Sequence, residues 1–294
     1  MDSEASRNIY RDRINRALNF IESNLSGDLQ LADVAREACF SPYHFHRIFC
    51  AMVGETPADY IHRLRLERSA VLLWSMYGLS VTEVAMQCGF SSPSVFSRNF
   101  KARFGSSPRV WKKARHDTVQ YHAQKIVLTE SKPYPVGLLS IGVKHESSRY
   151  TVCVRHQGYE APEILKIYQR FLAWLEAKKL VRDDGVFIGV CPDNLYITEP
   201  LKCRVYLCYT LPPCIDAPAL AGKTMTVQGG LVASIAFEGD PRYIDSAYQY
   251  YYHCWLPNSG FELDDRPDYM VFGPAVDLSS SVMRMTINIA IKAI

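Results

Sequence analysis

Residues 40–49 read FSPYHFHRIF, and residues 90–100 read FSSPSVFSRNF. With a shift of 51, the run from Ser41 to Phe49 aligns with the run from Ser92 to Phe100. Upstream of these runs the shift is 50, so that Phe40 falls on Phe90. The chain therefore contains one short pattern twice, with an extra residue in the turn of the second copy.

Each copy is predicted to form two short helices. The first helix runs from about Leu31 to Ala38 in one copy and from Ser80 to Gln87 in the other, and a tight turn follows it. Ser41 or Ser92 then offers a hydroxyl to the free amides of the next helix, and a proline fits its first turn. The apolar residues of this second helix recur at spacings that turn them inward: Phe45, Ile48, Phe49, Phe96 and Phe100. This is the helix-turn-helix plan, in which the second helix enters the major groove of DNA.

Two further helices complete an all-α domain over residues 1–115. One is capped by Thr56 and continues to about Trp74, which would hold the two modules at a fixed separation. The other opens the chain, from about Arg7 to Asn24. Two reading helices on one chain could contact successive major grooves about 34 Å apart without a dimer.

The charge distribution is consistent with a nucleic-acid partner. The 294 residues contain 33 Lys and Arg against 30 Asp and Glu, a net charge of only +3. From Arg98 to Arg115, however, there are seven basic residues and no acidic one. Such a run attracts a polyanion, although a solvated helix face has the same appearance.

The segment from Leu31 to Trp111 resembles the DNA-binding domain of the AraC/XylS family of bacterial transcription regulators. The motifs that carry the resemblance are Ala85, Gly89-Phe90, Phe96-Ser97-Arg98-Asn99-Phe100, Phe104-Gly105-Ser106-Ser107-Pro108, Gly54-Glu55-Thr56-Pro57, Tyr60 and Arg63-Leu64-Arg65-Leu66. The resemblance implies a regulator of double-stranded DNA, typically an activator that recruits RNA polymerase. It implies base contacts from the exposed positions of the two reading helices, which are Tyr43, His46, Arg47, Ser94, Ser97 and Arg98. His44 and Lys101 are better placed for phosphate.

The chemistry of these side chains leaves some alternatives open. Arg47 and Arg98 can each donate two hydrogen bonds to guanine, but either could instead form a salt bridge between helices. Tyr43 could stack on a sugar or meet a thymine methyl group, or it could be a core aromatic. His44 and His46 have no acidic neighbour or third ligand at metal spacing, so a metal site is not expected.

The character of the chain changes after Arg115. Residues 116–125 are polar and are expected to be a linker. Beyond them the pattern alternates and is rich in Tyr, Val and Ile, as in strands. The expected strands are Tyr150 to His156, Val186 to Val190, Arg204 to Leu211, Leu231 to Phe237, Tyr269 to Phe272 and Met283 to Ile291. The expected helices are Ala161 to Lys178 and Arg242 to Cys254.

This second half is also a repeat, with a shift of 81. Gly158 precedes one helix as Gly239 precedes the other, and Trp174-Leu175 falls on Trp255-Leu256. We therefore expect a multi-domain protein whose residues 126–294 form a pseudo-twofold α+β domain with antiparallel sheets. The seam between two such halves is a natural ligand cleft.

Most of the segment from Tyr150 to Ile291 resembles the GyrI-like small-molecule-binding domain of Rob-type regulators. The motifs are Arg155-His156-Gln157-Gly158-Tyr159, Phe187-Ile188-Gly189, Pro200, Cys203-Arg204, Gly229-Gly230-Leu231, Trp255-Leu256-Pro257-Asn258-Ser259-Gly260-Phe261 and Arg266-Pro267. Members often carry two glutamates that can face a cationic drug, and here Met270 and Thr286 replace them. Because a buried carboxylate would stabilise a desolvated cation, its loss favours a neutral or anionic amphiphile. The expected ligand-binding residues are Tyr150, Tyr159, Tyr206, Tyr209, Phe237, Trp255, Met270 and Thr286, although for any one of the aromatics core packing is favoured over ligand contact.

Two other functions remain possible for the second half. Some GyrI-like proteins are hydrolases, and candidate acids and bases are present: His156, Glu160, Glu163, Glu199, Glu238 and His253. They form no recognisable nucleophile, base and orienter series, so no catalytic residue and no enzyme activity are expected. The domain could also dock a partner without binding a ligand. No cofactor, metal site or membrane partner is expected, and the chain has neither a signal peptide nor a long apolar run, which favours the cytoplasm.

Overall fold

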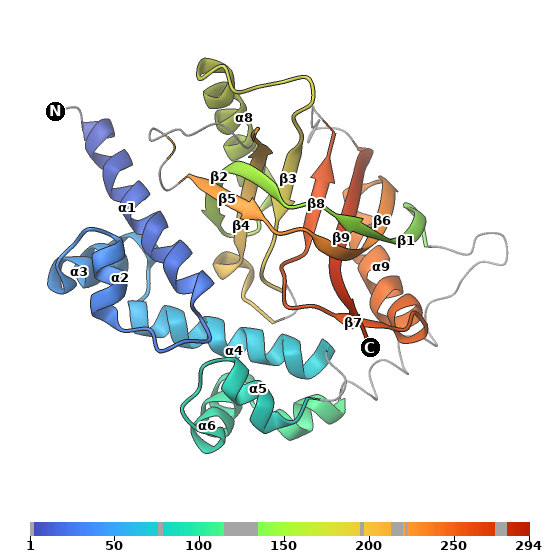
Figure 1. Ribbon diagram of the computed structural model, residues 1–294, viewed down its shortest axis with the longest axis horizontal. Helices are drawn as coiled ribbons and strands as arrows, with labels where there is room; N and C mark the ends of the chain where they lie inside the picture. Colours follow the sequence, from blue (N-terminus) through green and yellow to red (C-terminus); the bar gives the residue numbers. More distant parts are fainter. Residues whose placement is uncertain are drawn as a thin grey trace. The chain divides into compact units, whose positions relative to one another are not determined.

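The computed structural model describes residues 3–75, 79–114, 135–194, 197–212, 220, 223–273 and 281–294. The chain divides into two compact units. The first is helical, and the second contains a large antiparallel sheet with helices (Figure 1). Each unit has its own buried core. The expected linker at residues 116–125 lies outside the described residues.

The first unit has the helices that the repeat predicts. They are α1 (Ser3–Ser23), α2 (Leu31–Glu37), α3 (Pro42–Val53), α4 (Pro57–Ser75), α5 (Val81–Gln87) and α6 (Pro93–Phe104). Residues 108–114 are also helical. The pairs α2–α3 and α5–α6 are the two helix-turn-helix modules, and α4 connects them.

The two modules form matching backbone and capping hydrogen bonds. Ser41 Oγ accepts from the His44 amide at 3.4 Å, and Ser92 Oγ accepts from the Val95 amide at 3.3 Å. In the turns, the Phe40 amide donates to the carbonyl of Ala35, and the Phe90 amide donates to the carbonyl of Ala85. The predicted serine caps are therefore present at the start of both α3 and α6.

The turn between the two helices of each module requires a left-handed residue. Cys39 has a φ of 55° in the first module, and Gly89 has a φ of 78° in the second. A β-carbon added at Gly89 would lie 2.9 Å from the backbone oxygen of Leu25. Glycine is therefore needed in the second module, where the neighbouring backbone comes too close for a side chain.

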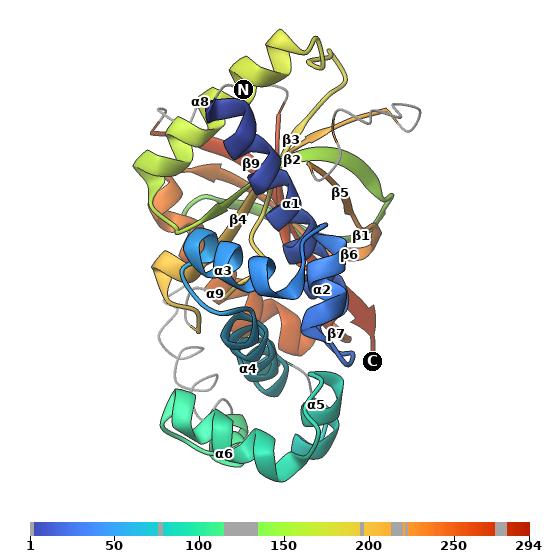
Figure 2. The same cartoon turned by 90° about the vertical axis from the view of Figure 1, so that its left-hand side faces the viewer.

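Helix α4 is buried on more than one side. Tyr60 and Leu64 belong to the core of the first module, and Leu66, Leu72 and Leu73 are also buried. Its start is capped as predicted, because the Asp59 amide donates to Thr56 Oγ1 at 3.1 Å. Helices α3 and α6 lie on either side of α4 (Figures 1 and 2). The connecting helix is therefore part of the core that joins the two modules.

The second unit contains one nine-stranded antiparallel sheet. Its strands are β1 (Leu138–Glu146), β2 (Arg149–Gln157), β3 (Phe187–Val190), β4 (Arg204–Thr210), β5 (Thr224–Val227), β6 (Gly230–Gly239), β7 (Phe261–Leu263), β8 (Tyr269–Phe272) and β9 (Met283–Ala293). Its helical segments are α8 (Ala161–Ala177), η1 (Pro200–Lys202), η3 (Pro241–Tyr243), α9 (Ile244–Tyr250), η4 (Tyr251–Trp255) and η5 (Leu256–Asn258).

The strand order has the predicted twofold symmetry. It runs β1-β6-β9-β8-β3-β4-β2-β5, and β7 pairs with β9 outside this path. If β1, β2, β3 and β4 correspond to β5, β6, β8 and β9, the order reads the same from either end. The first strand of each half pairs with the other half, and β3 and β8 meet at the centre. The seam between the halves therefore runs along the β3–β8 pair.

All six expected strands are present, and three others were not expected. The missed strands are β1, β5 and β7, of which β1 and β5 are the two ends of the sheet path. The expected helix from Arg242 to Cys254 is correct in place but is not one regular helix. It consists of a 3₁₀ turn, the α-helix α9 and a π-helical turn from Tyr251 to Trp255.

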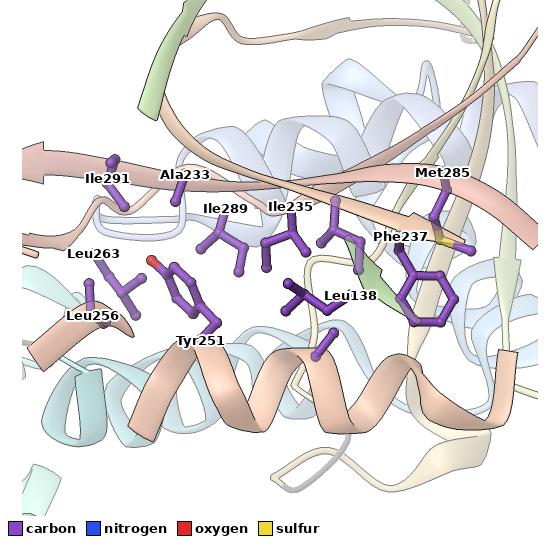
Figure 3. Close-up of a cluster of buried hydrophobic side chains, with 12 residues drawn as sticks. Leu138, Ala233, Ile235, Phe237, Tyr251, Leu256, Leu263, Met285, Ile289 and Ile291 are labelled. Atoms are coloured by element: carbon purple, nitrogen blue, oxygen red, sulfur yellow. The ribbon is translucent and has the colours of Figure 1, made fainter. Parts of the chain in front are cut away.

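The main core of the second unit lies between the sheet and α9. Figure 3 shows Leu138, Ile235, Phe237, Tyr251 and Ile289 meeting in this layer.

None of the helices in the described residues is long and apolar enough to cross a membrane.

Candidate DNA interface and ligand site

Helix α3 presents a polar face to solvent. Tyr43 is 68% exposed, and His44, His46 and Arg47 are also exposed, while Phe45 is fully buried on the opposite face. The Arg47 guanidinium carbon lies 5.8 Å from the centre of the Tyr43 ring. The tyrosine is thus a surface residue, and its ring borders the arginine that is expected to contact bases.

Helix α6 presents the equivalent face of the second module. Ser94, Arg98 and Lys101 are exposed and Ser97 is half-buried, while Phe96 is buried. Within the described part of the chain, neither Arg47 nor Arg98 forms a salt bridge, although ion pairs occur elsewhere in the first unit. The alternative of an interhelical salt bridge therefore finds no support, and both guanidinium groups are available to a ligand.

Three of the expected ligand residues lie in cores. Tyr209 is almost fully buried, and its hydroxyl donates to the Arg182 carbonyl at 3.0 Å and accepts from the Arg182 amide at 2.9 Å. Phe237 belongs to the core under α9 (Figure 3). Tyr206 is buried in a second cluster, with the Arg155 guanidinium 4.6 Å from its ring centre. The structure thus gives each of the three a packing role.

The other expected ligand residues retain accessible surface. Tyr150, Trp255, Met270 and Thr286 are half-buried. Trp255 and Met270 border the core under α9, and the Trp255 ring stacks at 5.4 Å on that of Tyr251. Tyr159 is 39% exposed, yet burial raises the pKa of its hydroxyl to about 12.

Sequence reasoning missed the most strongly perturbed carboxyl group of the second unit. Asp268 is half-buried and directly precedes β8, and burial raises its pKa to about 7. The Ala290 amide and the Tyr252 hydroxyl donate to it, which opposes this rise without cancelling it. Asp268 therefore combines partial accessibility with strong desolvation, as a carboxyl group in a recessed site does.

Aromatic side chains from the helical segment surround Asp268. The rings of Tyr248 and Tyr252 stack at 6.3 Å, and Tyr251 meets Tyr252 edge-on at 4.9 Å. Burial raises the pKa of all three hydroxyls, and the Asp268 carboxylate raises them further. Tyr251 and Tyr252 lie on the π-helical turn, a local irregularity that is frequent at functional sites.

The other half of the domain completes this group across the seam. Val190 of β3 is opposite Tyr269 of β8. The next residues, Cys191 and Asp268, therefore lie side by side at the end of the central strand pair. Burial, followed by the charges of Asp193, Cys203 and Asp268, raises the pKa of the Cys191 thiol to about 12. Cys191 and Tyr248 each interact electrostatically with Tyr159. We refer to Tyr159, Cys191, Tyr248, Tyr251, Tyr252 and Asp268 as the Asp268 cluster.

The internal repeat makes Asp268 stand out. The shift of 81 places Asp268 on Phe187, and it relates Gly189 to Met270, which are partners in the β3–β8 register. Phe187 is buried under α8, against Tyr168 and Tyr209. One half therefore has a core phenylalanine where the other has a carboxyl group. This mismatch, together with the tyrosine-rich run 248–252, is the sequence signal that could have identified the cluster.

Several of the candidate acids for hydrolysis form ion pairs at the surface. Glu163 pairs with Lys166 at 2.6 Å, Glu199 with Lys202 at 3.4 Å and Glu238 with Arg284 at 2.9 Å. Among the described residues there is no group of three His, Cys, Asp or Glu side chains placed to hold a metal ion.

Comparison with known proteins finds two family models that match successive parts of the chain. The model of a helix-turn-helix domain matches residues 34–114, and that of the GyrI-like small molecule binding domain matches residues 141–279. These ranges coincide with the two modules and with most of the sheet domain. The resemblances found from the motifs are thereby confirmed.

The relatives align with about a third of this chain. The HTH-type transcriptional activator AarP of Providencia stuartii is 33% identical over 99 residues, which are 34% of this chain and 73% of AarP. The regulator YbfP of Bacillus subtilis is 32% identical over 104 residues, only 35% of each protein. A crystal structure of an AraC-type regulator from Chromobacterium violaceum aligns at 27% identity, covering 38% of this chain and 96% of that one, with a TM-score of 0.33.

Proposed function

Because the chain belongs to the AraC-type helix-turn-helix transcription regulators and also contains a GyrI-like domain, we propose that it activates transcription in response to a small molecule. The observation that carries the DNA-binding part is the pair of exposed polar faces on α3 and α6, each with an arginine that has no ion-pair partner among the described residues. The named activity of AarP supports activation.

In this proposal both modules read one asymmetric DNA site. Arg47 and Arg98 contact guanines, Tyr43, His46, Ser94 and Ser97 contact neighbouring bases, and His44 and Lys101 contact phosphates. Tyr43 also restricts Arg47, since the guanidinium lies close to its ring. Such a site needs no symmetry, because the two reading helices differ in sequence.

The test is selection of duplex DNA from a random library by the full chain, followed by substitution. Arg47→Ala and Arg98→Ala should each weaken specific binding by about 1–3 kcal/mol and relax the preference at one base pair. Lys101→Ala should weaken binding to all sequences alike and lower its salt dependence. Arg36→Ala is the control, since Arg36 is an exposed arginine of α2 outside the reading helices. Unchanged site selection in both arginine variants would refute the assignment of the reading helices.

For the second unit we propose a ligand site at the Asp268 cluster. The sequence favours a neutral or anionic ligand because Met270 and Thr286 replace two glutamates, but Asp268 supplies a desolvated carboxyl group nearby. A protonated Asp268 can hydrogen-bond a neutral ligand, and an ionised one can pair with an amine over the tyrosine rings. An anionic ligand would be repelled. The proposed ligand is thus an amphiphile with a neutral or cationic polar group.

A thermal-shift screen of the full chain with cationic, neutral and anionic amphiphiles tests this site. Stabilisation by a neutral or cationic compound is expected. For a cationic compound, Asp268→Asn should lower the apparent affinity at least about tenfold. Asp183→Asn, a change at an exposed aspartate, is the control. Stabilisation by anionic compounds alone would overturn the proposed ligand class, and the absence of any response would favour a partner-docking domain.

Activation itself requires contact with RNA polymerase, which we propose on the family resemblance. Transcription in vitro from a promoter carrying the selected DNA site should rise when the chain is added, and it should change with a ligand found in the screen. A fall in transcription would identify a repressor instead.

A further inference from the structure

A buried network of charged side chains connects the two modules. Arg63 of α4 donates to Glu55, in the turn after α3, with its Nη2 atom 2.6 Å from Oε1. Arg63 Nη1 also donates to Glu67 Oε2 at 3.0 Å, and Arg103 Nη2 of α6 donates to Glu67 Oε1 at 3.3 Å. One oxygen of Glu67 therefore accepts from α6, and the other accepts from Arg63, which in turn donates to Glu55 after α3. The network runs from the end of one reading helix, through α4, to the last turn of the other.

Three of these four side chains are withdrawn from water, whereas that of Arg103 is 29% exposed. The side chains of Arg63 and Glu67 are 6% and 5% exposed, and that of Glu55 is 15% exposed. A buried ion pair adds little net stability, because desolvation offsets its attraction, but it tolerates few geometries. The network therefore contributes orientation more than stability, since rotation of α6 against α4 would break the hydrogen bond from Arg103 to the buried Glu67 carboxylate.

The helix-turn-helix module does not itself need the network. With the shift of 51 that relates the modules, Glu55 corresponds to Ser106, Arg63 to Ala114 and Arg103 to Met52. The equivalent residues in the other module thus fold without these charges. The network is specific to the junction between the modules, where α3 and α6 lie on either side of α4 (Figure 2).

We propose that Glu67 is a positioning residue for DNA reading, which through Arg63 and Arg103 holds α3 and α6 at one separation and angle. This inference rests on the proposed two-helix reading of DNA. A rigid pair of helices accepts only one spacing between its two half-sites, because an added base pair displaces the second half-site along and around the duplex. A loosened pair accepts several spacings.

The experiment uses the DNA site that the full wild-type chain selects, in which the two half-sites are the parts that the bound chain protects from nuclease. It is compared with versions that carry one base pair more or fewer between the half-sites. Dissociation constants are measured for the wild type, Glu67→Gln and Arg103→Met. The wild type should lose at least about tenfold in affinity when the spacing changes. The two variants should lose less than about threefold, while each half-site alone binds them as it binds the wild type.

Glu37→Gln, at an exposed glutamate of α2, is the matched control and should keep the wild-type spacing preference. Arg103→Met introduces the residue that the first module has at the equivalent position, Met52. This variant therefore tests the inference even if Glu67→Gln does not fold. Folded variants that keep the wild-type preference would overturn the inference and leave the network a purely structural role. A wild-type chain that protects only one half-site would instead refute reading by two helices, and the inference with it.

Discussion

Replacing Asp268 by asparagine should stabilise the second unit, and the gain should grow with pH. Burial raises the pKa of Asp268 from its ordinary value of 3.8 to about 7. Between these values the folded chain holds a proton that the unfolded chain has released, so raising the pH favours unfolding. Asparagine stays neutral at every pH and avoids this loss.

The difference in pKa of about 3 units corresponds to about 4 kcal/mol of lost stability above pH 7, at 1.36 kcal/mol per unit. This is an upper limit, because Asp268 keeps some contact with solvent. About half of the loss has already occurred at pH 5.5. Asp268→Asn should therefore gain about 2 kcal/mol more over the wild type at pH 8 than at pH 5.5, and any constant effect of the amide group on packing cancels in that comparison.

The measurement is unfolding of the full chain by urea at the two pH values, with wild type, Asp268→Asn and Asp183→Asn. Asp183 is exposed and its variant should follow the wild type at both pH values. An equal advantage of Asp268→Asn at pH 5.5 and pH 8 would show that the folded carboxyl group has an ordinary pKa. The argument for a recessed, desolvated site would then be wrong.

Further substitutions probe the fold around the two sites. Ser92→Ala should cost about 1 kcal/mol in urea unfolding, since Ser92 Oγ caps the amide of Val95, and an unchanged stability would refute the cap. Gly89→Ala should destabilise the first unit by more than Gly105→Ala, because both glycines have positive φ but only at Gly89 would the new methyl group meet a backbone oxygen; equal losses would contradict that contact. Phe237→Ala should cost about 3–5 kcal/mol in calorimetry, as expected for a buried core phenylalanine, whereas a loss of ligand response without loss of stability would make Phe237 a ligand residue instead.

The first unit could be predicted closely because its signals are local. Serine caps, prolines in first turns and phenylalanines at helical spacing act within one or two helical turns. The repetition of the pattern 51 residues later removed the ambiguity that a single copy would have left. The charge network escaped prediction since Glu55 and Arg103 are far apart in sequence, and nothing local indicates that Glu67 lies between two modules.

The second unit was harder because its edge strands and its site depend on long-range pairing. Strand β1 pairs with β6 of the other half, and its side chains are mostly exposed, so it lacks the buried run that β2 has. Strands β5 and β7 are only four and three residues long. Asp268 looks like an ordinary loop residue after Arg266-Pro267, since its burial comes from tyrosines about twenty residues away and from the other half.

The charge network of the first unit and the Asp268 cluster of the second both lie where an internal repeat loses its symmetry. Duplicated halves share the residues that fold each copy, such as the paired serine caps. A position where the two copies differ is therefore one where the residue has another role. Phe187 corresponds to Asp268, and the regular helix α8 corresponds to a segment that breaks into α9 and a π-helical turn. A carboxyl group in place of a core phenylalanine lowers stability. Retaining it is understandable if the chain uses it to bind something, and this is the reason to begin the ligand search at Asp268.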